Sequence, residues 1–203
     1  RLPGSWHGEP LAAPLDIAPG WPEKIQMATP TAVPRRSTGV RGRAHLLHAI
    51  AHIEYSAIQL ALDHALRFAA MPAAYYRDWL AVAAEEALHF DLVRQRLLSL
   101  GCDYGDFPVH DSLWRMAERS AGDVLVRMAL VPRLMEARGL DATPEIRQRL
   151  AAAGDLESAR VLDRILADEI GHVGLGDHWF RLLCEQRQLS PDATYRQLIR
   201  QYD

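Results

Sequence analysis

Cysteine is scarce in this sequence, and its scarcity excludes several kinds of site. The 203 residues include two cysteines, Cys102 and Cys184, which form no CxxC pair and no disulfide framework. We interpret them as reduced thiols in a reducing compartment. A structural zinc site built on cysteine is thereby excluded.

Long apolar runs and an excess of basic charge are also missing. No stretch of about 18 apolar residues could span a bilayer, and no charged and then apolar leader opens the chain. The formal net charge is -3 and the pI is about 6.3, so the protein has no overall basic excess to attract nucleic acid or a membrane surface. We expect a cytoplasmic protein with no membrane partner, and a nucleic-acid partner would need a local patch. The sequence begins at Arg1 without methionine, which leaves open whether residues precede it.

Proline is sparse after residue 38 but frequent before it. Seven of the twelve prolines lie in the first 38 residues, and no regular helix tolerates that spacing. Trp6 and Trp21 lie among these prolines and make the segment too apolar for a free linker. We predict that residues 1–38 form an extended proline-rich arm packed on a single domain of residues 39–203.

Four long stretches have the apolar spacing of helices, and none has the alternation of a strand. We predict helices over about residues 42–70, 72–101, 111–138 and 155–186, with a short helix over 144–153 between the last two. Pro72 suits a first helical turn, and Gly101 and Gly139 suit helix ends. Four apolar helix faces can be buried together in an antiparallel four-helix bundle, so the predicted fold class is all-α.

The predicted helices carry glutamate and histidine in a repeated arrangement. A lone glutamate precedes an ExxH motif in each half of the chain, with a spacing of 32 residues in the first half and 33 in the second. Residues three apart on a helix share one face, so each ExxH directs a carboxylate and an imidazole to the same place. The resulting candidate metal ligands and catalytic residues are Glu54, Glu86, His89, Glu136, Glu169 and His172.

Four carboxylates buried together need compensating positive charge. Like charges at low dielectric raise one another's pKa, and desolvation adds to the cost. Two divalent metal ions would remove that cost, and oxygen and imidazole ligands without thiolate suit iron or manganese. We predict two iron ions, with manganese or a mixed pair as the alternative. The other interpretation, four solvated glutamates and two surface histidines, requires all six to avoid the core, although Glu54 and Glu136 have apolar neighbours.

Several residues near these candidate ligands have predicted supporting roles. Glu85 and Asp168 directly precede the two ExxH motifs, and we predict that each orients the histidine of the opposite helix, with a solvated acid as the alternative. Pro132 should bend its helix one turn before Glu136. We predict close helix packing at three glycines, Gly171, Gly174 and Gly176. We also predict that three histidines, His45, His48 and His52, lie at the surface or an interface and are not ligands.

Five segments of the chain resemble the ferritin-like superfamily and, within it, an uncharacterised bacterial family designated only as a domain of unknown function. The segments are HAIAHIEYSAIQLALD (48–63), YYRDWLAVAAEEALHF (75–90), YGDFPVHDSLW (104–114), ALVPRLMEARGLDATP (129–144) and ILADEIGHVGLGDHWF (165–180). The resemblance covers about residues 34 to 185. It implies that Glu86 and Glu169 bridge two metals, that Glu54 and Glu136 are terminal ligands, and that each histidine binds one metal.

The leading functional expectation is a di-iron oxidase or hydroxylase that uses dioxygen and a small-molecule substrate, with electrons from a separate reductase. A ferroxidase of an iron-storage or detoxifying assembly is the first alternative. Hydroxylation of tRNA is a second, for which the acidic balance offers only a small arginine cluster before residue 44. A helical interaction protein with a structural metal is the third. The oligomeric state is left open, with a dimer among the options.

Overall fold

The computed structural model describes residues 18–33 and 39–202, and this part of the chain is built from helices. The first two are α1 (Val40–Arg67) and α2 (Ala73–Ser99), followed by α3 (Ser112–Arg119), α4 (Val124–Leu130) and the π-helical turn η1 (Val131–Met135). The chain continues with α5 (Glu136–Ala152), α6 (Leu156–Gln186) and α7 (Pro191–Tyr202). Within the described residues the extended pairing is limited to one isolated bridge, Met27 with Val109. The prediction of an all-α chain is confirmed.

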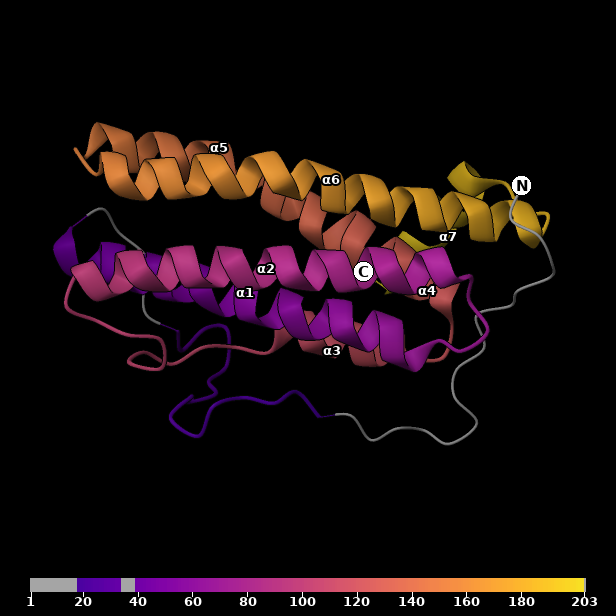
Figure 1. The fold of residues 1–203 in the computed structure, drawn as a ribbon, viewed down its shortest axis with the longest axis horizontal. Helices are drawn as coiled ribbons and strands as arrows, with labels where there is room; N and C mark the ends of the chain where they lie inside the picture. Colours follow the sequence, from indigo (N-terminus) through magenta and orange to yellow (C-terminus); the bar gives the residue numbers. More distant parts are fainter. Residues whose placement is uncertain (1–17, 34–38, 203) are drawn as a thin grey trace.

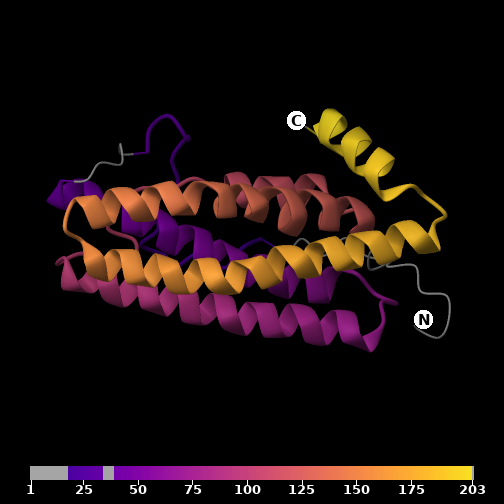
Figure 2. The ribbon, with the colours of Figure 1, turned by 90° about the horizontal axis from the view of Figure 1, so that it is seen from above.

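The long helices lie along a common direction in two antiparallel pairs. α1 packs along α2, α5 packs along α6, and α2 also contacts α6 (Figure 1). α4 and η1 lead into α5 and pack against α6, while α7 turns back beside the end of α6 (Figure 2). None of the described helices is both long and apolar enough to cross a membrane.

Two apolar clusters divide the core along its length. One contains Trp79 on α2 and Trp179 on α6, and the other contains Leu47 on α1 and Leu97 on α2. On α1, α2 and α6 alike, the predicted ligands fall between the residues of the first cluster and those of the second. The candidate site therefore occupies a polar layer with apolar packing on both sides of it.

The predicted helix over residues 111–138 is wrong in its continuity. α3 ends at Arg119, and the turn at Ser120-Ala121-Gly122-Asp123 separates it from α4. The Asp123 carboxylate accepts a hydrogen bond from the backbone N–H of Leu125 at 2.8 Å and so caps the start of α4. Ser120, Gly122 and the N-cap Asp123 together favour the end of one helix and the start of another. The prediction of a continuous helix did not take this pattern into account.

The predicted helix end at Gly139 is also wrong. α5 continues through Gly139 and Pro144 to Ala152, so the short helix predicted over 144–153 is the last part of a longer one. A glycine in a helix costs only about 1 kcal/mol, which packing of α5 on α6 can outweigh. Thr143 directly precedes Pro144, and its hydroxyl donates a hydrogen bond to the Gly139 carbonyl at 2.8 Å.

Residues 18–33 lie across α1 and the loop that follows α2. The N–H of Ala28 donates to the Val109 carbonyl at 2.8 Å, and the Val109 N–H donates to the Gln26 carbonyl at 2.9 Å. The Tyr55 hydroxyl on α1 donates to the Gly20 carbonyl at 3.0 Å. This part of the predicted arm therefore packs on the helices, whereas residues 1–17 and 34–38 lie outside the described residues.

The three glycines of α6 have different surroundings. A Cβ added to Gly176 would lie 2.6 Å from the Cβ of Pro132 and 3.3 Å from the backbone nitrogen of Arg133, so here the predicted close packing is present. A Cβ on Gly171 or Gly174 would meet nothing within 4 Å, so close packing inside this chain does not explain those two. Gly176 thus allows α6 to contact the π-helical turn directly.

We expect Gly176→Ala to lower the free energy of unfolding by about 1–3 kcal/mol, because the new methyl group overpacks the contact with Pro132. Gly174→Ala is the matched control on the same helix and should raise stability by up to about 1 kcal/mol, since alanine is the better helix former. Urea unfolding followed by circular dichroism measures both. Equal shifts of the same sign in the two variants would contradict the assignment of the contact to Gly176.

Candidate metal centre

Four of the six predicted ligands converge on one point. Glu54 of α1, Glu86 and His89 of α2, and Glu169 of α6 each offer a ligand atom, and these atoms all lie within 4.8 Å of one another. The His89 Nδ1 atom is 3.6 Å from Glu54 Oε2, 3.4 Å from Glu86 Oε2 and 3.6 Å from Glu169 Oε1. Helix periodicity places these residues on the inner faces of three helices, so one metal ion could contact all four.

His172 lies close to two of these three carboxylates, Glu86 and Glu169. Its Nδ1 atom is 2.9 Å from Glu86 Oε1 and 3.5 Å from Glu169 Oε1. The centroids of the His89 and His172 rings are 5.8 Å apart. Each oxygen of Glu86 thus faces a different imidazole, so this carboxylate could contact a metal ion at each of its oxygens.

Glu136 completes the set from the first residue of α5. The π-helical turn η1 ends directly before it, and the Glu136 N–H bonds back to the Val131 carbonyl, five residues earlier. Pro132 cannot donate its own helical hydrogen bond, so the wider turn forms where the sequence predicted a bend. Among the described residues the four-ligand group does not include Glu136 or His172. Glu136 is nevertheless close enough for its charge to interact with Glu169, Glu86 and His172.

Five of the candidate ligand atoms are buried but lack hydrogen-bond partners of good geometry. This is true of both oxygens of Glu86, one oxygen of Glu136, and the Nδ1 atoms of His89 and His172. Buried polar atoms are nearly always satisfied in folded proteins, so several unsatisfied atoms gathered in one place call for an absent partner. Oxygen and imidazole nitrogen are the ligands that iron and manganese accept, and the residues present therefore fit a pair of such ions.

Burial and the neighbouring carboxylates make the charged forms of two glutamates of the site unfavourable. Burial raises the pKa of Glu54 to about 8, and the negative charges of Glu86 and Glu169 also raise it. Burial also raises the pKa of Glu136, again with a contribution from the neighbouring carboxylates. The charged forms of Glu54 and Glu136 are therefore unfavourable here unless positive charge is added.

Protons on the two imidazoles supply that charge when metal is absent. Burial alone would lower the pKa of His89, but the surrounding carboxylates outweigh it and raise the pKa to about 12. The pKa of His172 is raised to about 11 by the same balance, and the two imidazoles lower the pKa of Glu86 to about 2 against the effect of burial. Metal ions would take over the role of these protons.

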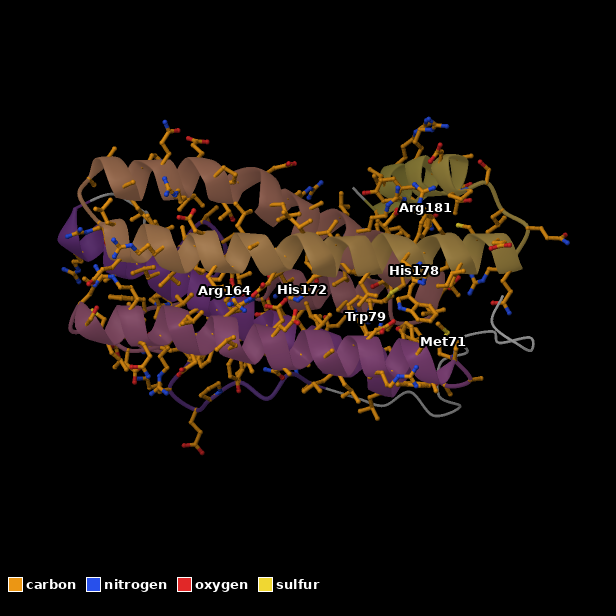
Figure 3. All side chains as sticks on the ribbon, turned by 45° about the horizontal axis from the view of Figure 1, so that its top comes forward. Met71, Trp79, Arg164, His172, His178 and Arg181 are labelled. Atoms are coloured by element: carbon orange, nitrogen blue, oxygen red, sulfur yellow. The ribbon has the colours of Figure 1, made fainter. Side chains whose placement is uncertain are left out.

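Two acids contact the outer nitrogens of the histidines, each across the helix interface as predicted. The His89 Nε2 atom on α2 is 3.0 Å from Asp168 Oδ2 on α6, and the His172 Nε2 atom on α6 is 2.7 Å from Glu85 Oε2 on α2. His172 lies where α6 faces α2 (Figure 3). A carboxylate that accepts a hydrogen bond from Nε2–H favours the tautomer whose Nδ1 lone pair is directed inward, and this is the tautomer that a metal needs. Arg164 also donates to Asp168, at 2.8 Å.

A cavity of about 340 Å³ opens onto the carboxylates but not onto His89 or His172. It lies between α1, η1, α5, α6 and residues 107–113 of the loop and the start of α3, and its lining includes all four glutamates of the site. Most of its other lining side chains are apolar. The carboxylate side of the centre is therefore the accessible side.

The prediction that the α1 histidines lie at the surface or an interface is wrong for two of the three, which are buried within the chain. His48 and His52 are 1% and 5% exposed, and burial lowers the pKa of both to about 4. The Gly105 N–H donates to His48 Nε2 at 2.8 Å, and His52 Nδ1 lies 2.8 Å from the Tyr104 hydroxyl. His45 is half-buried against Phe107. The loop after α2 and residues 18–33 cover this side of α1, and helix periodicity alone could not show that cover.

The comparisons with known proteins agree with one another. A protein from Haemophilus influenzae, described as an uncharacterized protein, is 45% identical over 201 residues, which cover 95% of this chain and 70% of that protein. No solved structure matches the chain. The family model described as a protein of unknown function, DUF455, matches residues 5–203 and so spans both ExxH motifs and both lone glutamates. The chain belongs to the DUF455 family.

Proposed function

We propose that this protein is a ferritin-like di-iron carboxylate protein that activates dioxygen to oxidise a small-molecule substrate. The observation that carries the proposal is the gathering of buried, unsatisfied carboxylate and imidazole atoms at the inner end of an apolar cavity. Iron bound at this centre would supply the electrons that reduce dioxygen. A separate reductase would return those electrons.

The residues of the chain have distinct tasks in this proposal. Glu86 and Glu169 would hold both metals, while Glu54 with His89 and Glu136 with His172 would complete the two ends. Glu85 and Asp168 would orient the imidazoles by accepting hydrogen bonds from their Nε2–H groups. The apolar packing on both sides of the ligand layer limits the access of bulk water to the centre.

The cavity favours substrate oxidation over iron storage. Iron on its way to a mineral store would pass polar groups, whereas this cavity presents mainly apolar side chains in front of the carboxylates. A ferroxidase remains the second candidate because its centre would use the same ligands. The two differ in capacity, since a storage protein takes up many more than two irons per chain and assembles into a shell.

The test is an anaerobic titration of metal-free protein with ferrous iron, followed by exposure to dioxygen. We expect saturation at two irons per chain, oxygen consumption in proportion to bound iron, and a change in the visible spectrum. Native mass should correspond to a small assembly. Fewer than one iron per chain, or two irons that do not react with oxygen, would overturn the oxidase proposal. Continued iron uptake by a large shell would establish the storage alternative instead.

A further inference from the structure

The π-helical turn η1 determines the direction in which Glu136 points. The Glu136 N–H bonds to the Val131 carbonyl, five residues earlier, so this turn holds one residue more than an α-helical turn. Successive residues of an α-helix are rotated by about 100°, because one turn takes 3.6 residues. Loss of the wide turn would therefore rotate Glu136 relative to α4 by about that angle. Contacts that hold η1 in place also position this candidate ligand.

Arg133, in the middle of η1, contacts two side chains of α6. Its Nε atom is 2.8 Å from Oδ1 of Asp177, a carboxylate that also accepts a hydrogen bond from Arg181 at 2.6 Å. The centre of the Phe180 ring lies 4.8 Å from the guanidinium carbon of Arg133. The Nη1 atom of Arg133 is buried and has no hydrogen-bond partner among the described residues. Aromatic faces therefore supply part of the environment of this charge.

The closer of the two aromatic contacts comes from α7. This helix packs on α4 and α6 (Figure 1), and the ring centre of its half-buried Tyr195 lies 3.8 Å from the guanidinium carbon of Arg133. A cation over the face of an aromatic ring is attracted by the electrons of the ring, and the attraction grows as water is excluded. The Arg133 side chain is only 16% exposed. The last described helix of the chain is thus attached to the turn that precedes Glu136.

We propose that α7 positions Glu136 through the contact between Tyr195 and Arg133. Both are positioning residues in this arrangement, since neither is a candidate ligand. The inference rests on the proposed function for its consequence at the metals, but the effect of the contact on η1 does not need metal. Glu136 would bind the metal on the His172 side, so loosening of η1 should weaken that metal and spare the other.

The first measurement is hydrogen exchange of the Glu136 backbone N–H in metal-free protein, followed by NMR. Tyr195→Leu removes the ring and should speed this exchange about twofold to thirtyfold, the size of a cation–π contact. Tyr195→Phe keeps the ring and should exchange like wild type. Tyr202→Leu is the matched control, because Tyr202 is the other half-buried tyrosine of α7 and its ring centre lies 5.3 Å from the guanidinium carbon of Arg119 on α3. This variant should leave the exchange of Glu136 unchanged.

The second measurement is an anaerobic titration of the same variants with ferrous iron. Tyr195→Leu should weaken one of the two bound irons by a similar factor and leave the other unchanged, whereas Tyr195→Phe and Tyr202→Leu should bind both like wild type.

Three outcomes would overturn the inference. They are unchanged Glu136 exchange in Tyr195→Leu, equal effects of Tyr195→Leu and Tyr202→Leu, and faster exchange in Tyr195→Leu with both irons bound as in wild type. Failure of the wild-type protein to bind iron would overturn the proposed function instead. The exchange measurement on metal-free protein would still decide whether Tyr195 holds η1.

Discussion

We expect Glu86→Ala to abolish tight binding of the two proposed metal ions. The Glu86 side chain is 1% exposed, and its two oxygens face the two different histidines at 2.9 and 3.4 Å. Loss of a residue that only orients a ligand typically reduces metal affinity about 10-fold to 100-fold, and loss of a ligand shared by both metals should exceed that range. We expect fewer than one bound metal per chain after gel filtration, measured by elemental analysis.

The neighbouring residue provides the matched control. Glu85→Ala removes a carboxylate of the same helix that contacts only the outer nitrogen of His172, and it should retain two metals with an affinity lowered about 10-fold to 100-fold. Circular dichroism of both metal-free variants shows whether the helices persist. Two metals retained at wild-type affinity in Glu86→Ala would contradict the shared position of this carboxylate.

The second large effect concerns a buried ion pair outside the metal centre. Asp63 on α1 is 3% exposed and Arg127 on α4 is fully buried, and their side chains are hydrogen-bonded. Arg127 also donates to the Ala117 carbonyl of α3 at 2.6 Å and to the Ser120 hydroxyl at 2.9 Å. Asp63→Ala leaves a buried guanidinium without its counter-ion. We expect a loss of about 3–5 kcal/mol in the free energy of unfolding, measured by urea titration.

An exposed ion pair supplies the comparison for this prediction. Asp163 pairs with Arg147 at 2.9 Å on the surface, so Asp163→Ala should leave the unfolding midpoint within experimental error of wild type. A loss of similar size in both variants would show that the buried position of Asp63 is not the cause.

The Asp63 pair also predicts a response to acid. Burial would raise the pKa of Asp63, but the guanidinium groups of Arg67 and Arg127 outweigh it, so the pKa in the folded protein is lowered. The unfolded chain, with an ordinary pKa of about 3.9, then binds the proton more readily than the folded protein. This contribution to stability is complete above that pH and is lost as the pH falls toward the lowered value. Unfolding midpoints measured between pH 6 and 3 should therefore fall less in Asp63→Asn than in wild type.

Much of the fold followed from periodicity and from residues with strong local preferences. The predicted limits of α2 and α6 agree with the structure to within a few residues, because Pro72, Gly101 and Asp155 mark their ends. The third predicted helix was wrong in its interior, which is broken at residues 120–123, and in its end, because packing against α6 outweighs the preferences of Gly139 and Pro144. α7 was not predicted at all.

The arrangement of the candidate ligands was easier to predict from the sequence than the structure around them. The spacing of the ExxH motifs fixes which side chains share a helix face, and the structure does bring Glu54, Glu86, His89 and Glu169 together. The cross-helix contacts of Glu85 and Asp168 also agree with prediction. The cavity could not be predicted, since its walls come from loops and helices whose relative positions depend on tertiary packing. The burial of His48 and His52 escaped prediction for the same reason.

The reciprocal contacts between α2 and α6 give the two sides of the centre different mechanical properties. Each of these helices contributes a histidine to the centre and an acid to the other helix's histidine, so sliding one helix along the other would break both contacts at once. The imidazole side is thus braced. Glu54 and Glu136 line the cavity from α1 and α5, which carry neither of these histidines. If metals bind as proposed, we expect changes in their coordination to begin at these two carboxylates.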